Sequence, residues 1–304
     1  MRPHPVRRLL PVLMAALLLV PAAARAQQDL SAVQVRTQHV AGSVHMLTGA
    51  GGNVAVVAGT DGVFLVDDQF APLTEKIRAA VARISPAPVR FVLNTHWHGD
   101  HTGGNENLGR AGALIVAHDN VRTRMSADQF MNRMTDTVKA SPPGALPVVT
   151  FTSAVTFHLN GDEVHAFHVP PAHTDGDAIV HFRRADVVHM GDTYFNGLYP
   201  YIDISSGGSV DGIIAAADRV LAMTREGTRI IPGHGPLSGR AELRAYREML
   251  VTVRDRVRAL VREGKTLQQV QAAKPSAEFD ARWGQGFMKP ASFVRVVYES
   301  VARR

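Results

Sequence analysis

The pattern of apolar and polar residues predicts a chain that begins with strands and continues as alternating strands and helices. Apolar runs at residues 54–57 and 63–66 flank a glycine-containing turn, which is typical of a β-hairpin. Apolar residues at helical spacing cover residues 71–84, and the apolar run at 89–93 leads directly into a cluster of histidines. We therefore expect this cluster at the carboxyl end of a buried strand.

The rest of the chain continues this alternation. Residues 117–140 are expected to be largely helical, up to the breaker Ser141-Pro142-Pro143-Gly144. Further strands are predicted at residues 113–116, 155–159, 163–169, 178–182 and 187–190. Amphipathic helices are predicted at residues 208–223, 240–261 and 291–301. This order favours an α/β fold in which two packed sheets are covered by helices, an αββα four-layer sandwich.

The first 26 residues differ in composition from the rest of the chain. Arginines precede the uncharged run at residues 9–20, and small residues follow it up to Ala26. This order is typical of a signal peptide, and the apolar run is shorter than the ~20 residues that span a bilayer. We therefore expect cleavage after Ala26, by the Sec or twin-arginine route, and a single domain at residues 27–304. The mature protein is expected to be periplasmic or secreted, without a stable membrane anchor.

Charge and cysteine content narrow the classes of function. The chain has 33 Lys and Arg against 27 Asp and Glu, but four of the arginines and none of the acids lie in residues 1–26. The mature chain therefore has 29 basic residues against 27 acidic ones, so its formal charge falls from +6 to +2. It contains no basic run typical of a nucleic-acid or membrane surface, which leaves a small molecule as the expected partner. The absence of cysteine excludes disulfides and thiolate metal ligands.

The run Thr95-His96-Trp97-His98-Gly99-Asp100-His101 carries the strongest chemical signal in the sequence. Imidazole nitrogens and a carboxylate are ligands that suit zinc and its neighbours, and solvated loop histidines do not account for such a density of them. The glycine within the run is expected to permit a tight backbone that points alternate side chains inward. The run therefore predicts a metal site.

This run resembles the His-x-His-x-Asp-His signature of the metallo-β-lactamase superfamily. Three later residues match the remaining positions of that pattern: His173 its isolated histidine, Asp192 its bridging acid and His234 its last histidine. The resemblance extends from about Val40 to the C-terminus, and it implies the αββα fold of that superfamily.

The resemblance also implies a site for two metal ions, with zinc expected and iron or manganese as alternatives. It assigns His96, His98 and His173 to the first ion, Asp100, His101 and His234 to the second, and Asp192 to a bridge between them. Two ions roughly 3.5–4 Å apart can polarise a carbonyl, activate water as hydroxide and stabilise the leaving group. Asp100 is the catalytic candidate, because its carboxylate would orient the nucleophile and pass a proton to the leaving group.

Several substrate classes fit this chemistry. Esters, thioesters, lactones and amides, β-lactams included, all present an acyl carbon to a metal-activated nucleophile. β-Lactamases of the superfamily usually have cysteine or serine where Asp192 stands, so the ligand set is more similar to the glyoxalase-II and lactonase branches. The whole pattern resembles most the exported cyclase- or quinoprotein-relay-type members. Two other classes remain open: an iron-dependent persulfide dioxygenase and a metal-binding protein without turnover.

A few other residues are weaker candidates for the site. Asp67 is expected either to fix a ligand imidazole or to be a turn residue, and His118 either to face the site or to lie on the surface. The aromatic loop at residues 193–201 is expected to line the substrate site or to belong to the core. Four histidines on strands are predicted to serve packing or to lie on the surface: His165, His168, His181 and His189.

Overall fold

The computed structural model describes residues 29–131 and 136–302, so the leader predicted at residues 1–26 lies outside the described residues. Among the helices of these two ranges, none combines the length and the apolar character needed to cross a membrane.

The first sheet positions the histidine run. Its strand order is β1 (Arg36–Ala41), β2 (Val44–Thr48), β3 (Val54–Gly59), β4 (Gly62–Val66), β5 (Val89–Leu93), β6 (Leu114–His118) and β9 (Val149–Phe151). Strands β1 to β4 are antiparallel neighbours, and the predicted β3–β4 hairpin is confirmed. Strands β4, β5, β6 and β9 run parallel, so their carboxyl ends meet at one edge of the sheet. The histidine run follows β5 at that edge.

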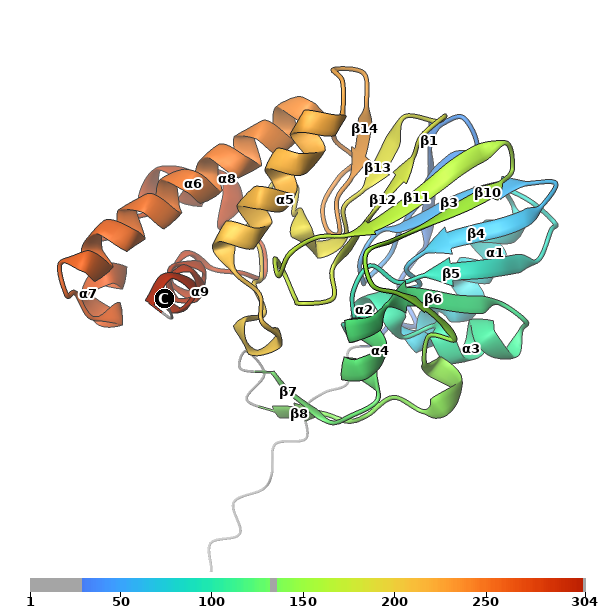
Figure 1. The fold of residues 1–304 in the computed structure, drawn as a ribbon, viewed down its shortest axis with the longest axis horizontal. Coiled ribbons are helices and arrows are strands. Elements are labelled where there is room, and N and C mark those ends of the chain that lie inside the picture. Colours follow the sequence, from blue (N-terminus) through green and yellow to red (C-terminus); the bar gives the residue numbers. More distant parts are fainter. Residues whose placement is uncertain (1–28, 132–135, 303–304) are drawn as a thin grey trace, which may run out of the picture.

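The second sheet packs against the first (Figure 1). Its strand order is β10 (Ala154–Leu159), β11 (Asp162–His168), β12 (Ala178–Phe182), β13 (Val187–His189) and β14 (Arg229–Ile231). Neighbours from β10 to β13 are antiparallel, whereas β13 and β14 are parallel. Apolar side chains from the facing sides of both sheets form one buried cluster, which includes Val57, Phe64, Val164 and Val180.

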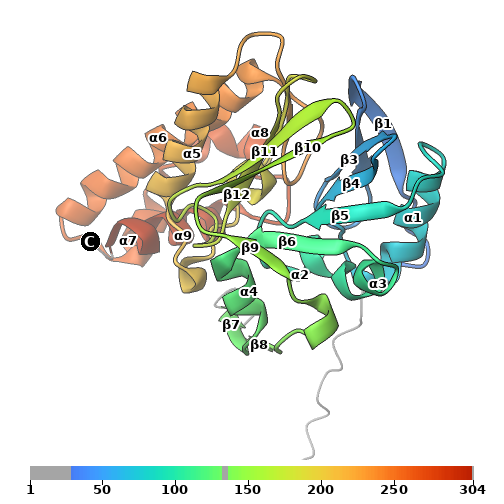
Figure 2. The same cartoon turned by 45° about the vertical axis from the view of Figure 1, so that its right-hand side comes forward.

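Helices cover the two outer faces (Figure 2). Helices α1 (Thr74–Ala82) and α3 (Asn105–Arg110) lie on the first sheet, with a core that includes Ile77 and Leu108. The second sheet is covered by α5 (Val210–Met223), α6 (Arg240–Arg262) and α9 (Pro290–Ala302). The shorter helices are α2 (Gly99–Thr102), α4 (Asp119–Met125), α7 (Leu267–Ala272) and α8 (Asp280–Trp283). The layers follow the predicted αββα order.

The long helix predicted at residues 117–140 is wrong. Helix α4 ends at Met125, and β7 (Gln129–Met131) and β8 (Asp136–Val138) follow as an antiparallel hairpin. The carboxylate of Asp128 accepts the backbone N–H of Ala140 at 2.9 Å and pairs with Lys139 at 2.8 Å. Such side-chain bonds to the backbone compete with helix formation, and a polar composition does not reveal them.

Phe64 shows how much the contact between the sheets depends on single side chains. Its ring is fully buried and contacts Phe157 of the second sheet at a centroid distance of 4.9 Å. We expect Phe64→Ala to lower the free energy of unfolding by about 3–5 kcal/mol, because it leaves a cavity between the sheets. Urea unfolding measures this, with the exposed Phe130→Ala as a control that stays within about 0.5 kcal/mol of the wild type. Equal losses in both variants would contradict this account of the core.

Candidate metal centre

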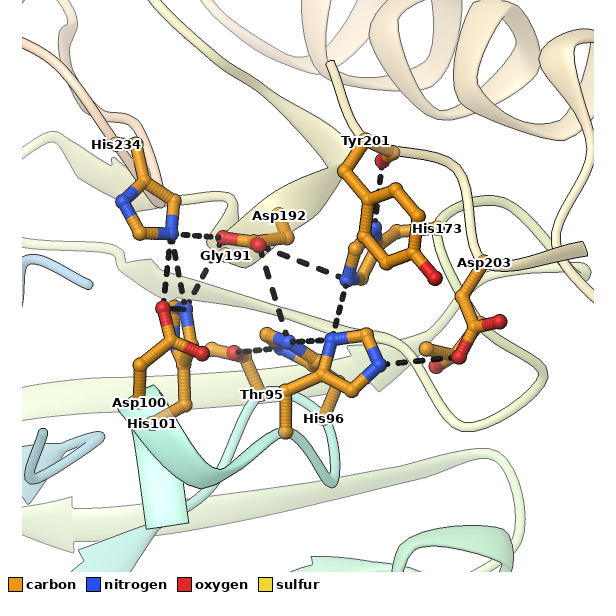
Figure 3. A network of polar contacts seen from close by, with 12 residues as sticks. Thr95, His96, Asp100, His101, His173, Gly191, Asp192, Tyr201, Asp203 and His234 are labelled. Atoms are coloured by element: carbon orange, nitrogen blue, oxygen red, sulfur yellow. Dashed lines mark hydrogen bonds and ion pairs between the residues drawn. The ribbon is translucent and has the colours of Figure 1, made fainter. Parts of the chain in front are cut away.

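The seven residues predicted as ligands converge at one edge of the two sheets (Figure 3). The first sheet supplies four of them from the loop after β5 and from α2: His96, His98, Asp100 and His101. The second sheet supplies three from the loops after β11, β13 and β14: His173, Asp192 and His234. Each therefore follows the carboxyl end of a strand, where the side chains of neighbouring loops face one another.

A first group is formed by three histidines and an aspartate, all of them buried. Nδ1 of His98 lies 3.1 Å from Nε2 of His96 and 2.9 Å from Nε2 of His173. Oδ2 of Asp192 lies 3.5 Å from Nε2 of His173 and 3.9 Å from Nε2 of His96. Three ring nitrogens and one carboxylate oxygen thus surround a single point.

A second group lies beside the first. Nε2 of His101 and Nε2 of His234 are 3.4 Å apart, and Oδ2 of Asp100 lies 3.3 Å from Nε2 of His234. Oδ1 of Asp192 is 3.1 Å from His101 Nε2 and 3.4 Å from His234 Nε2. Asp192 therefore turns one oxygen toward each group, the arrangement expected of a bridging carboxylate.

Hydrogen bonds on the outer side of four rings fix which nitrogen points inward. Carboxylate and carbonyl oxygens can only accept, so His98 Nε2 donates to Asp203 (3.1 Å), His101 Nδ1 to Asp67 (2.8 Å) and His173 Nδ1 to the carbonyl of Tyr201 (2.8 Å). The Thr95 hydroxyl donates to Asp67, so it accepts from His96 Nδ1 at 3.1 Å. The inward nitrogens therefore carry lone pairs.

This donor set fits a divalent metal ion. The lone pairs of His96, His98 and His173, whose inward nitrogens lie 2.9 and 3.1 Å apart, repel one another unless a cation lies between them. Oδ1 of Asp192 is buried and has no hydrogen-bond partner among the described residues, so it too is available as a ligand. Nitrogen and oxygen donors without thiolate suit zinc and neighbouring metals.

The two groups differ in their electrostatics. Burial holds the pKa of His96 well below its ordinary value and lowers the pKa of His173 to about 4. Burial also opposes the charge on His234, but Asp192 and Asp100 outweigh it and raise the pKa of His234 to about 9. Proton binding to the second group therefore competes with cation binding there.

Glycines let the loops approach the ligands closely. A Cβ on Gly52 would lie 2.1 Å from the His101 ring, and a Cβ on Gly233 would lie 2.1 Å from Oδ1 of Asp192. The role predicted for Gly99 is wrong, because it has open space where a Cβ would lie and no positive φ. The glycines that the site requires come from other loops, so the histidine run alone could not identify them.

The contact predicted between Asp67 and a ligand imidazole is present. Besides His101, Asp67 accepts the backbone N–H and the hydroxyl of Thr95, at 2.7 and 2.8 Å. Its φ of +63° lies in the left-handed region, which aspartate tolerates better than most residues. Backbone strain of this kind is concentrated at functional sites.

Asp203 is a functional candidate that the sequence analysis missed. Its carboxylate is fully buried and accepts from His98 Nε2 and, at 2.5 Å, from the Ser206 hydroxyl. The indole N–H of Trp97 donates to the same hydroxyl at 3.2 Å. No local pattern marks this residue, because its partner lies more than 100 positions earlier in the chain.

The remaining candidates play structural roles. His118 is buried and caps α4 by accepting the backbone N–H of Asn120, so it neither faces the site nor lies on the surface. The packing or surface role predicted for four histidines agrees with their absence from both ligand groups: His165, His168, His181 and His189. In the aromatic loop, Tyr194 and Tyr199 are core residues, whereas the ring of Phe195 stacks on His234.

Most of the chain matches the sequence model of one protein family. The model of the family described as the metallo-beta-lactamase superfamily matches residues 47–237. Hydroxyacylglutathione hydrolases from Polaromonas sp. and Nitrosococcus oceani are 26% and 29% identical to this chain over 178 and 164 residues. These alignments cover 58% and 54% of this chain, and 60% and 55% of those enzymes. The chain thus spans less than two thirds of the length of these relatives.

Solved structures show the same fold. A metallo-beta-lactamase from Pontibacter korlensis is similar with a TM-score of 0.59 at 18% identity, over 72% of this chain and 99% of that one. The sec-alkylsulfatase Pisa1 from Pseudomonas sp. gives a TM-score of 0.65 at 17% identity, over 87% of this chain and 50% of that one. The predicted αββα fold is confirmed.

The hydrogen bond from His98 to Asp203 predicts an effect on metal affinity. We expect Asp203→Ala to weaken metal binding about 10- to 100-fold, because the His98 ring loses the acceptor that orients Nδ1 inward. Competition with a chromogenic chelator measures this. Asp218→Ala is the control, since Asp218 pairs with Arg247 on the exposed side of α5. Similar affinities in all three proteins would show that Asp203 does not position His98.

Proposed function

Because this chain belongs to the metallo-β-lactamase superfamily, we propose that it is a binuclear metal-dependent hydrolase that cleaves an acyl bond in a small molecule. The observation that carries the proposal is the position of Asp192, which turns one oxygen toward each of two ligand groups. A site for a single ion would not require the second group of ligands. The signal peptide expected at residues 1–26 supports a periplasmic or secreted location as part of the same proposal.

Each group would hold one ion, and zinc is the metal that we propose. The ligands are those named from the sequence: His96, His98 and His173 for the first ion, Asp100, His101 and His234 for the second, and Asp192 for both. Divalent ions at such a site supply a Lewis acid for the carbonyl and activate water near neutral pH. The outer hydrogen bonds keep the rings oriented for this task.

Asp100 is the residue that we propose to handle the nucleophile. Its side chain is 28% exposed, whereas Asp192 is 6% exposed, so Asp100 is the carboxylate within reach of solvent. Its Oδ2 is held 3.3 Å from Nε2 of His234, which fixes the direction of the carboxylate. Asp100 would accept a hydrogen bond from the attacking water, take up the proton that this water loses, and later pass that proton to the leaving group.

Thioesters and esters are the first substrates to test. Two relatives are named hydroxyacylglutathione hydrolases, and Asp192 stands where β-lactamases of the superfamily usually have cysteine or serine. The purified protein should be analysed for metal and assayed with chromogenic thioester, ester, lactone and β-lactam substrates. About two zinc equivalents and hydrolysis of one class support the proposal. A single iron and oxygen uptake with a persulfide would instead assign the protein to the dioxygenase class.

Replacement of Asp192 tests the binuclear site directly. Asp192→Ala removes an oxygen from each group and leaves three ligands in each. The second group should lose its ion first, because it is partly exposed whereas the first is buried. We expect about one metal equivalent per chain and a kcat at least about 100-fold lower. Metal analysis and kinetics of Asp192→Ala and Asp192→Ser, side by side with Asp218→Ala, measure this. Full occupancy with an unchanged rate in Asp192→Ala would show that Asp192 is not a ligand.

A further inference from the structure

The metal centre is exposed on one side only. The side chains of Asp100 and His234 are 28% and 19% exposed, whereas those of His96, His101 and His173 are at most 1% exposed. In Figure 3, His234 and Asp100 lie at one end of the cluster, and Tyr201 and Asp203 lie at the other. A molecule that arrives from solvent therefore meets the second group first.

Two phenylalanine rings flank His234 at this exposed end. The ring of Phe195 stacks on the imidazole at a centroid distance of 5.2 Å and an interplanar angle of 11°. The ring of Phe287 lies 6.2 Å from the imidazole, with its plane at 65°, and 6.0 Å from the ring of Phe195. Phe195 is fully buried, whereas Phe287 is 45% exposed. Phe287 therefore extends the apolar surface beside His234 from the core to the solvent.

The segment that carries Phe287 is fixed in place. It joins α8 to α9, and its neighbours Trp283 and Met288 are buried. The carbonyl of Trp283 accepts the backbone N–H of Tyr199 at 2.8 Å, and a Cβ on Gly286 would lie 2.7 Å from Cδ2 of Leu198. The segment is thus packed against the loop that follows Asp192. It also lies outside residues 47–237, the part of the chain that the family shares.

We propose that Phe287, supported by the buried ring of Phe195, forms an apolar wall beside His234 that binds an aryl or alkyl group of the substrate. The inference rests on the proposed function, in which the substrate reacts at the metal centre. Rings in edge-to-face or stacked contact favour a further ring over water, and a preorganised ring loses little entropy when it binds one. Phe287 would therefore select substrates that carry an apolar group next to the reacting bond.

Two probes with the same metal-binding head group isolate this contact. Acetohydroxamate and phenylacetohydroxamate differ by one phenyl ring, and calorimetry of the metal-loaded protein measures their affinities without turnover. We expect the wild type to bind the phenyl probe about tenfold more tightly, and Phe287→Ala to lose most of this preference while its affinity for acetohydroxamate changes less than about twofold. Phe287→Leu should retain part of the preference.

A matched control and a metal measurement separate the possible outcomes. Leu114 is 46% exposed at the start of β6, whereas the metal centre lies beyond the carboxyl ends of the strands, so Leu114→Ala should bind both probes as the wild type does. Equal affinities of the wild type for the two probes would overturn the proposal. Loss of bound metal in Phe287→Ala, or loss of its affinity for both probes, would also overturn it. If the protein binds the phenyl probe more tightly but hydrolyses no acyl substrate, the proposed function is contradicted. The proposed role of Phe287 in binding an apolar group is then still supported.

Discussion

The geometry of the metal centre depends most on the hydrogen bonds that the buried carboxylate of Asp67 accepts. It lies at the end of β4 and accepts from Thr95, after β5, and from His101, in α2. Through the Thr95 hydroxyl it also orients His96, so one carboxylate aligns a ring in each ligand group. A buried charge is costly unless several donors satisfy it, and here three do. Loss of any one donor would leave this buried carboxylate incompletely satisfied.

Buried hydrogen-bond acceptors orient the other imidazole rings of the site in the same way. Asp203 and the Tyr201 carbonyl hold His98 and His173 as Asp67 holds His101. These acceptors are buried, so the rings keep one direction whether or not solvent reaches the site. The site is therefore preorganised by contacts that lie behind the ligands, and it opens to solvent only at Asp100 and His234.

The convergence of the seven candidate ligands could be predicted from the sequence because most of them lie in one short run and the others follow strand ends in a recognisable order. The hairpin at β3–β4 and the long amphipathic helices were predictable because their periodicity is local. The hairpin at β7–β8 was not, since it is accompanied by a bond between the Asp128 carboxylate and the backbone of Ala140, 12 positions away, that no local pattern reveals. Asp203, Gly52 and Gly233 act on residues far away in the chain, so only the fold reveals them.

The candidate ligands of each group come from both sheets, and this has a consequence for unfolding. An ion bound to His96 and His173, or to His101 and His234, joins segments that are 77 or 133 positions apart. The chain contains no cysteine, so it has no covalent cross-link between its halves. Coordination bonds would instead join these segments in the folded protein only, so the binding free energy of each ion would add to the free energy of unfolding.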